Sequence, residues 1–186
     1  MSRGLGDVYK RQCMDSMVNK YTANKRLRSE DAYTPDGRPD MRPDYPSTVY
    51  SQILKKLFPD VPVVIGGIEA SLRRLSHYDY WQDKVQKSIL CDSGADLLIY
   101  GMGEKPLADL VKNMKSLLTT EEPVLTSSKF RTIIGSVPQT AYLCRATEWT
   151  SAEDDLQLYS HEECLADKKK PVSYTHLRAH ETCADL

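Results

Sequence analysis

Residues 62–80 read PVVIGGIEASLRRLSHYDY, and residues 95–104 read ADLLIYGMGE. Each stretch begins as an apolar run, turns at glycines and continues into a segment that favours a helix. Continuously apolar strands are typical of a parallel sheet that is covered on both faces. In open α/β sheets, ligands bind outside the carboxyl ends of such strands. The two stretches therefore predict part of a ligand-site scaffold at the glycine turns.

The segments on either side predict an α/β fold with parallel strands joined by right-handed crossovers. The expected elements are helices over 14–28, 47–57, 69–75, 83–91, 101–118 and 153–167, strands over 61–65 and 96–100, and an edge hairpin over 126–145. Two central strands do not make a stable open sheet alone. We therefore expect a truncated domain, with at least one further βα unit before residue 13.

The helix over 47–57 is expected to be capped by Ser47 and ended by Pro59. Its apolar residues fall on one face: Val49, Ile53, Leu54 and Leu57. The segment before it is expected to be an extended loop, because proline fixes φ and removes an amide donor. The prolines of this loop are Pro35, Pro39, Pro43 and Pro46. Five basic residues predict either a phosphate-facing surface or a solvated face: Lys20, Lys25, Arg26, Arg28 and the later Arg38.

The composition excludes several classes of protein. The chain has 186 residues, with 25 Lys and Arg against 26 Asp and Glu, which argues against bulk electrostatic capture of nucleic acid or of an anionic membrane. No apolar run approaches the roughly 20 residues of a spanning helix, and no secretory signal is visible. The cysteines have no disulfide or metal-knuckle spacing: Cys13, Cys91, Cys144, Cys164 and Cys183. We expect free thiols, a cytoplasmic location, and neither a membrane nor a nucleic-acid partner.

The two ends of the chain lack the helical and strand patterns that residues 13–170 show. Residues 1–12 and 171–186 show no helical or strand periodicity, and both resemble translated sequencing-adapter ends. Ordinary disordered tails are the alternative, and either interpretation excludes these residues from the fold. The domain is therefore expected at 13–170. His176 and His180 have the spacing of a metal pair but are not taken as one.

Three short motifs could contact a ligand. The GGIEASLRR turn offers backbone amides and two arginines to a phosphate or carboxylate, although a turn without a ligand explains it equally. In SHYDYW, a histidine and an acid form either an acid/base pair or a structural corner, beside aromatic rings that could stack on a flat ligand. The YGMGE turn ends in a carboxylate that serves as a helix cap or as a ligand contact. The candidate ligand-binding residues are Gly66, Gly67, Glu69, Arg73, Arg74, His77, Tyr78, Asp79, Tyr80, Trp81, Gly101, Gly103 and Glu104. No catalytic residue and no metal ligand is assigned.

Four segments together carry a resemblance to a known family. They are MDSMVNKYTANKRLRSEDAYTPDG, VPVVIGGIEASLRRLSHYDYWQDKVQKSIL, ADLLIYGMGE and HEECLADKKK. Over roughly residues 13–170 the chain resembles the N-terminal domain of the YgiQ family of radical SAM proteins. The resemblance implies a flavodoxin-like, cobalamin-binding-domain-like fold that precedes a radical SAM barrel.

In that family the barrel implies a [4Fe–4S] cluster held by a CxxxCxxC motif and S-adenosylmethionine on the open iron position. This chain contains neither a CxxxCxxC nor a DxHxxG cobalamin-ligand motif. We therefore expect no cofactor in the chain itself, with the cluster and S-adenosylmethionine held by its parent protein. Whether the chain alone is an enzyme stays open.

Two functions follow from the residues and the resemblance. The first is the non-catalytic N-terminal domain of a radical SAM enzyme of undefined substrate, inactive alone and partnered with the barrel of its own parent chain. The alternative is a stand-alone α/β binding module, with a nucleotide-like or corrinoid ligand at the two glycine turns. A small-molecule or a macromolecular substrate is compatible with the first.

Overall fold

A computed structural model describes residues 15–117, 125–148, 155–167 and 169–170. The helices are α2 (Ser16–Lys20), α3 (Pro46–Leu57), α4 (Gly67–Leu72), α5 (Ile89–Ser93), α6 (Glu104–Leu117), α7 (Ser127–Ile134) and α8 (His161–Ala166). The strands are β1 (Val64–Ile65), β2 (His77–Asp79), β3 (Lys84–Gln86), β4 (Leu97–Ile99) and β5 (Thr140–Ala141). Two 3-10 turns, Pro35–Gly37 and Ala146–Glu148, complete the described elements.

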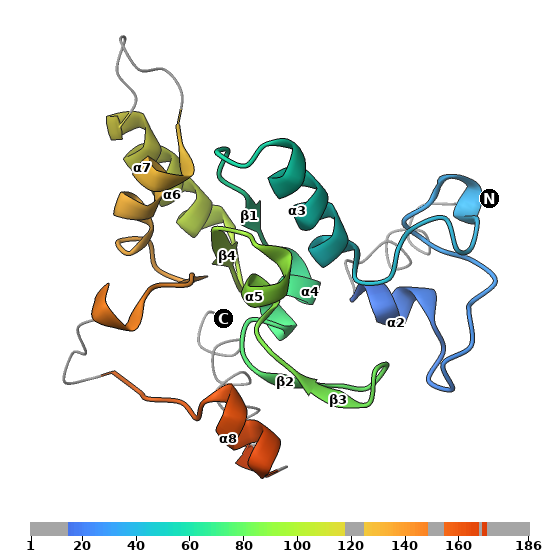
Figure 1. The fold of residues 1–186 in the computed structure, drawn as a ribbon. Helices are drawn as coiled ribbons and strands as arrows, with labels where there is room; N and C mark the ends of the chain where they lie inside the picture. The colour runs from blue at the N-terminus through green and yellow to red at the C-terminus, as the bar shows by residue number, and fades with distance from the viewer. Residues whose placement is uncertain (1–14, 118–124, 149–154, 168, 171–186) are drawn as a thin grey trace.

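The central sheet has the order β1-β4-β5. β1 and β4 are parallel, with Val64 opposite Leu97, and β5 lies antiparallel on the other edge of β4. Helices lie on both sides of this sheet, α6 and α7 on one and α3, α4 and α5 on the other (Figure 1). The predicted α/β class and the parallel pairing of the two apolar segments are confirmed.

Two apolar clusters lie on opposite faces of β4, because successive strand residues point to opposite sides. Leu98 packs with residues of α4 and α5, such as Ala70 and Ile89. Leu97 and Ile99 pack with Leu110 of α6 and with Phe130, Ile134 and Val137 in and after α7. All three residues of β4 are buried. β4 is therefore the element that both layers of helices share.

The helix predicted over 83–91 is confirmed only at its end, where Ile89 and Leu90 are buried in α5, and is wrong over residues 84–86, which form a strand. β2 and β3 pair antiparallel as a hairpin, with Tyr78 opposite Val85. The Asp79 carboxylate accepts hydrogen bonds from the amides of Trp81 (2.8 Å) and Gln82 (3.1 Å), which closes the turn. The turn closed by the Asp79 side chain reverses the chain, so the apolar residues after it do not continue as a helix despite their helical spacing.

The edge hairpin predicted over 126–145 is also wrong. Its first half is the helix α7, and only Thr140–Ala141 pairs with the sheet. Phe130 and Ile134 are four residues apart, so they lie on one helical face and bury against β4. Packing of that face explains why a segment with weak alternation is helical.

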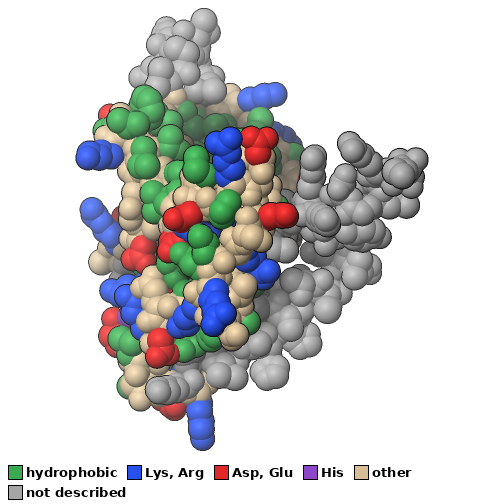
Figure 2. Space-filling view, turned by 90° about the vertical axis from the view of Figure 1, so that its right-hand side faces the viewer, with side chains coloured by type: hydrophobic (Ala, Val, Ile, Leu, Met, Phe, Trp, Pro, Cys, Tyr) green, Lys and Arg blue, Asp and Glu red, His purple; other side chains and the backbone are tan. Residues whose placement is uncertain are grey.

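α3 begins one residue earlier than predicted and presents its apolar face outward. Its N-cap is Tyr45, with Pro46 in the first turn, rather than Ser47. Ile53, Leu54 and Leu57 are 48%, 45% and 64% exposed. On this side of the molecule, hydrophobic side chains gather in the upper part of the surface (Figure 2).

Polar contacts fix the opposite side of α3. Lys55 Nζ lies 2.6 Å from Asp96 Oδ2, whose carboxylate also accepts the Val63 amide at 2.8 Å. The Gln52 side-chain amide donates to the Asp92 carbonyl at 2.8 Å. The residues of α3 that face β4 and α5 are thus largely its polar ones.

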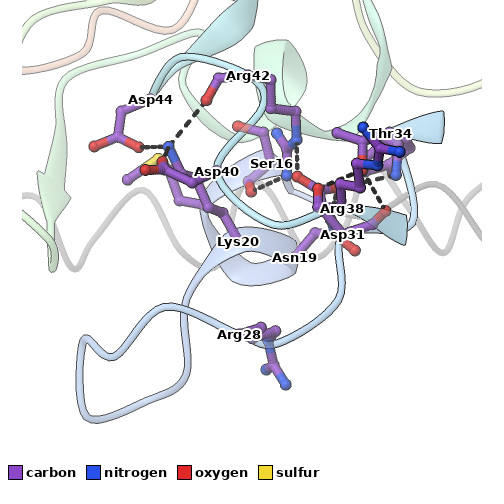
Figure 3. A network of polar contacts seen from close by, with 12 residues as sticks. Ser16, Asn19, Lys20, Arg28, Asp31, Thr34, Arg38, Asp40, Arg42 and Asp44 are labelled. Atoms are coloured by element: carbon purple, nitrogen blue, oxygen red, sulfur yellow. Dashed lines mark hydrogen bonds and ion pairs between the residues drawn. The ribbon is translucent and has the colours of Figure 1, made fainter. Parts of the chain in front are cut away.

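The proline-containing loop over 29–46 is fastened to α2 by a buried polar network (Figure 3). Asp31 is 1% exposed and accepts hydrogen bonds from the Asn19 amide (2.6 Å), the Tyr33 amide (2.9 Å) and Arg42 Nε (2.5 Å). Arg42 also donates to the Ser16 carbonyl at 2.9 Å. The loop is therefore held in one position despite its lack of regular structure.

Lys20 belongs to the same network and does not face solvent. It is 5% exposed, and its ammonium lies 3.0 Å from Asp40 and 2.9 Å from Asp44. Burial alone would lower the Lys20 pKa, but these two carboxylates outweigh burial and raise it. For Lys20, both the phosphate-facing and the solvated-face interpretations are therefore wrong. No helix in the described part of the chain is long and apolar enough to cross a membrane.

Candidate functional site

The two glycine turns lie side by side at the carboxyl edge of the sheet, as the parallel pairing requires. Gly66 and Gly67 follow β1, and Gly101 and Gly103 follow β4. A Cβ on Gly66 would lie 3.3 Å from the Ile99 carbonyl oxygen, so the backbones approach closely there. Gly67 and Gly101 have φ values of 80° and 68°, which L side chains rarely adopt.

Glu104 is the first residue of α6, where a carboxylate interacts favourably with the helix macrodipole. Neither Glu104 nor any of these four glycines lines the cavity of about 160 Å³ at Tyr45 or the cavity of about 320 Å³ at Arg74. The predicted use of the turns as a ligand site stays a prediction.

Glu69 and Arg73 of the predicted set are buried beneath the turn that follows β1. They are 8% and 9% exposed. Both guanidinium NH groups of Arg73 donate to the Asp15 carboxylate, which joins α4 to the residue before α2. Burial would lower the Arg73 pKa, but Asp15 outweighs it and raises the pKa. Asp15 therefore already neutralises the charge of Arg73.

Arg73, His77 and Asp79 come together around a cavity of about 160 Å³ between α3, α5 and the β2–β3 hairpin. His77 and Asp79 are two residues apart in a strand, so both side chains point to this cavity. His77 Nδ1 lies 3.0 Å from the Leu75 carbonyl, which can only accept, so Nδ1 carries the hydrogen. Asp79 is 4% exposed.

Tyr45 lines the same cavity and was not predicted from the sequence. Burial, together with the neighbouring Asp79 carboxylate, raises its pKa, so the phenol stays protonated near neutral pH. Among the described residues, Arg73 Nε is buried without a hydrogen-bond partner. Tyr45 OH is also buried without a partner at ordinary hydrogen-bond geometry, although it lies close enough to Asp79 for that carboxylate to raise its pKa. The cavity therefore offers the Arg73 donor, and the Tyr45 hydroxyl beside Asp79, to a bound water or ligand.

The predicted aromatic residues do not line this cavity. Tyr78 and Tyr80 are 55% and 50% exposed. Tyr80 OH donates to the Ala23 carbonyl at 2.7 Å, and the Trp81 ring centroid lies 5.5 Å from that of Tyr21. Lys25 Nζ lies 4.8 Å from the Tyr80 ring centroid. These contacts hold the loop over 21–27 against the hairpin, which is a packing role.

A second cavity of about 320 Å³ contains Arg74 of the predicted set. It is also lined by Lys87 and Ser88 before α5, and by residues at the start of α8. Ser76 Oγ lies 3.3 Å from His161 Nδ1, and this contact joins α8 to the residue before β2. Because residues 76 and 161 are 85 positions apart, no local pattern in the sequence predicts the pair.

The comparison with known protein families gives one match across this scaffold. The family described as Radical SAM N-terminal matches residues 9–184. The chain therefore belongs to this radical SAM N-terminal family, and the resemblance to YgiQ-type proteins is confirmed. The match extends beyond the predicted domain limits at residues 13 and 170, which stay predictions.

Named relatives support the same assignment. The chain is 79% identical to a UPF0313 protein of Bacteroides thetaiotaomicron over 160 residues, which is 86% of this chain and 26% of the relative. It is 61% identical to a UPF0313 protein of Porphyromonas gingivalis over 157 residues, 84% of this chain and 23% of the relative. A UPF0313 protein of Methanocella arvoryzae is 56% identical over 103 residues, 55% of this chain and 17% of the relative.

The chain thus spans about a quarter of the length of the first two relatives. No solved structure matches it.

Proposed function

We propose that this chain is the non-catalytic N-terminal domain of a radical SAM enzyme and is inactive alone. The main support for this proposal is the family match over residues 9–184. The relatives are about four times as long as the matched region, which leaves room for a catalytic barrel in the parent protein. The domain would cover the mouth of that barrel and shape the space for a substrate that is not yet defined. The parent would be cytoplasmic.

The residues of this chain do not fit a [4Fe–4S] cluster. Such a cluster requires cysteine thiolates, and the sequence contains no CxxxCxxC. Of the three described cysteines, Cys164 is buried, while Cys91 and Cys144 are exposed. Within the described ranges, no three His, Cys, Asp or Glu side chains are grouped so as to hold a metal ion. The cluster and S-adenosylmethionine therefore belong, in this proposal, to the barrel of the parent.

Reconstitution with iron and sulfide tests this proposal. We expect this chain to show no visible absorbance from a cluster after anaerobic reconstitution, since it lacks the required thiolate triplet. The full-length relative from Bacteroides thetaiotaomicron, treated in parallel, should show the cluster bands and bind about four iron atoms per chain. A stoichiometric cluster on this chain, or none on the relative, would contradict the proposal.

A second candidate function is a stand-alone binding module for a nucleotide-like or corrinoid ligand. The observation that favours a binding module is the 160 Å³ cavity that contains Tyr45 and the unpartnered Arg73 Nε, which lies apart from the two glycine turns where such a ligand was expected. A ligand that accepts hydrogen bonds would satisfy Arg73 Nε.

Calorimetric titration with S-adenosylmethionine, nucleotides and cobalamin separates the two functions. The leading proposal expects no ligand that binds this cavity with a Kd below about 1 μM. Tight binding that Tyr45→Phe weakens would favour the binding module, because this change removes only the hydroxyl group. Tyr50→Phe, on the exposed side of α3, is the matched control and should leave binding unchanged.

A further inference from the structure

The outer edge of β1 is open to a further strand. In the described part of the chain the sheet order is β1-β4-β5, so β1 pairs on one side alone. The Val63 carbonyl accepts the Asp96 amide at 2.9 Å, which directs the backbone groups of Val63 toward β4. Successive residues of a parallel strand direct their N–H and C=O groups to opposite edges. Val64 therefore presents its N–H and C=O groups to the outer edge.

The side chain of Val64 is also uncovered. Val64 pairs with Leu97, so both side chains lie on the same face of the sheet. Leu97 is buried on that face by α6 and α7, whereas Val64 is 39% exposed and belongs to neither apolar cluster. Strands of parallel sheets are usually covered on both faces. The α6 side of β1 lacks that cover among the described residues.

One flank of α6 is uncovered in the same region. The Asn113 side-chain amide donates to Ser136 Oγ, after α7, at 3.1 Å, which identifies the flank of α6 that faces α7. At 3.6 residues per turn, Leu107 and Val111 lie on the other flank. They are 51% and 41% exposed and belong to neither apolar cluster. Because α7 leads to β5, on the far edge of β4, the flank with Leu107 and Val111 is the one toward β1.

A strand accompanied by a helix fits this surface. The backbone groups of Val64 are the donor and acceptor of an unfinished ladder, and such an edge is a template for another strand. The apolar surface beside it, on Val64 and α6, is of the kind that helices cover in α/β domains. A flexible polar partner would satisfy neither part of the surface.

The route of the chain indicates where the strand comes from. α4 follows β1, and Arg73 at its end forms an ion pair with Asp15, the N-cap of α2. α2 therefore lies beside α4, past the carboxyl end of β1, and α3 returns the chain to the start of β1 (Figure 1). A chain that leaves the carboxyl edge and returns through a helix follows the crossover between neighbouring parallel strands.

We propose that in the parent protein a parallel strand that leads into α2 pairs with the outer edge of β1, and that a helix before this strand covers Val64, Leu107 and Val111. The further βα unit predicted before residue 13 would dock at this surface. The docking requires a parent longer than this chain, as the relatives are. It does not require the iron–sulfur cluster proposed above.

Photo-crosslinking in the full-length relative from Bacteroides thetaiotaomicron tests the docking. Leu107→p-benzoylphenylalanine and Val111→p-benzoylphenylalanine, made at the aligned positions, each place a photoreactive ketone on the open flank of α6. We expect irradiation to join each probe, within one chain, to the segment that precedes the position of Asp15. Lys112→p-benzoylphenylalanine is the matched control. It lies on the exposed side of the same helix and should lose that product.

Three results would overturn the proposal. The first is the absence of a crosslink to the preceding segment from both probes. The second is a crosslink to residues after the position of Lys170, which would place the barrel on this flank. The third is a crosslink between two copies, which would indicate a dimer. The iron content of the same relative, measured after reconstitution, tests the radical SAM proposal separately, so failure of one proposal is distinguishable from failure of the other.

Discussion

Replacing Phe130 with alanine should remove most of the protection of β4 against amide exchange. Phe130 is fully buried and packs with Leu97, Ile99 and Leu110 in the cluster on the α6–α7 side of the sheet. Replacing a buried phenylalanine with alanine lowers the free energy of unfolding by about 3–5 kcal/mol, a value that includes the cost of the cavity that remains. At about 1.4 kcal/mol per tenfold, exchange in β4 should become at least a hundredfold faster.

The chain provides a matched control for this change. Phe58, the only other phenylalanine, follows α3 and is 54% exposed. Phe58→Ala should change the exchange of β4 by a few-fold at most, because it opens no cavity in the described core. Hydrogen exchange with mass spectrometry, on peptides that cover residues 95–110, measures both variants. Equal effects of the two substitutions would show that the cluster around Phe130 does not stabilise β4.

Replacing Asp31 with alanine should release the loop over 29–46 from α2. Asp31 is the shared acceptor for Asn19, Tyr33 and Arg42, and its removal leaves the buried Arg42 without its carboxylate. Breaking a buried ion pair by deleting one partner costs about 3–5 kcal/mol. Amide protection in peptides that cover the loop should therefore fall about a hundredfold or more.

Two variants control for this result. Glu30→Ala removes the neighbouring carboxylate, which is exposed, and should leave the protection of the loop unchanged. Asp31→Asn keeps the shape but not the charge, and should give an intermediate loss. If Glu30→Ala and Asp31→Ala had the same effect, the buried network would not be what fastens the loop.

The same polar network around Asp31 predicts that amide protection of the loop over 29–46 depends on pH. Burial alone would raise the Asp31 pKa, but the Tyr33 amide and Arg42 outweigh burial and lower it below the ordinary value of 3.8. A carboxyl group with a lowered pKa in the folded state stabilises that state fully above its unfolded pKa and loses the effect as pH falls through the folded pKa. Loop protection, corrected for intrinsic exchange, should therefore decline below about pH 4 in the unaltered chain. Asp31→Asn should lack that component.

The sheet could be predicted from the sequence because its signal is local. The apolar runs before Gly66 and Gly101 are long enough to indicate buried strands, and parallel pairing follows from the helices between them. The spacing of His77 and Asp79 places both on one face if the segment is a strand, but the strand itself was not predicted. These elements depend on residues that are close in sequence.

The cavities could not be predicted, because each depends on contacts between distant segments. Tyr45 reaches the first cavity from the turn before α3, and its position depends on how the loop over 29–46 returns to the domain. The second cavity depends on α8, which meets Ser76 through His161. The β2–β3 hairpin was missed for a different reason, since one side-chain turn at Asp79 overrides the helical spacing of the residues after it.

The orientation of α3 has an evolutionary consequence. An ionic contact, Lys55 with Asp96, attaches this helix to the sheet, while Ile53 and Leu57 are exposed and belong to neither described apolar cluster. Substitutions at these two outward positions can therefore accumulate without straining β4. Under the function proposed above, selection there would follow whatever surface the catalytic barrel brings against them, whereas Lys55 and Asp96 should change together or not at all.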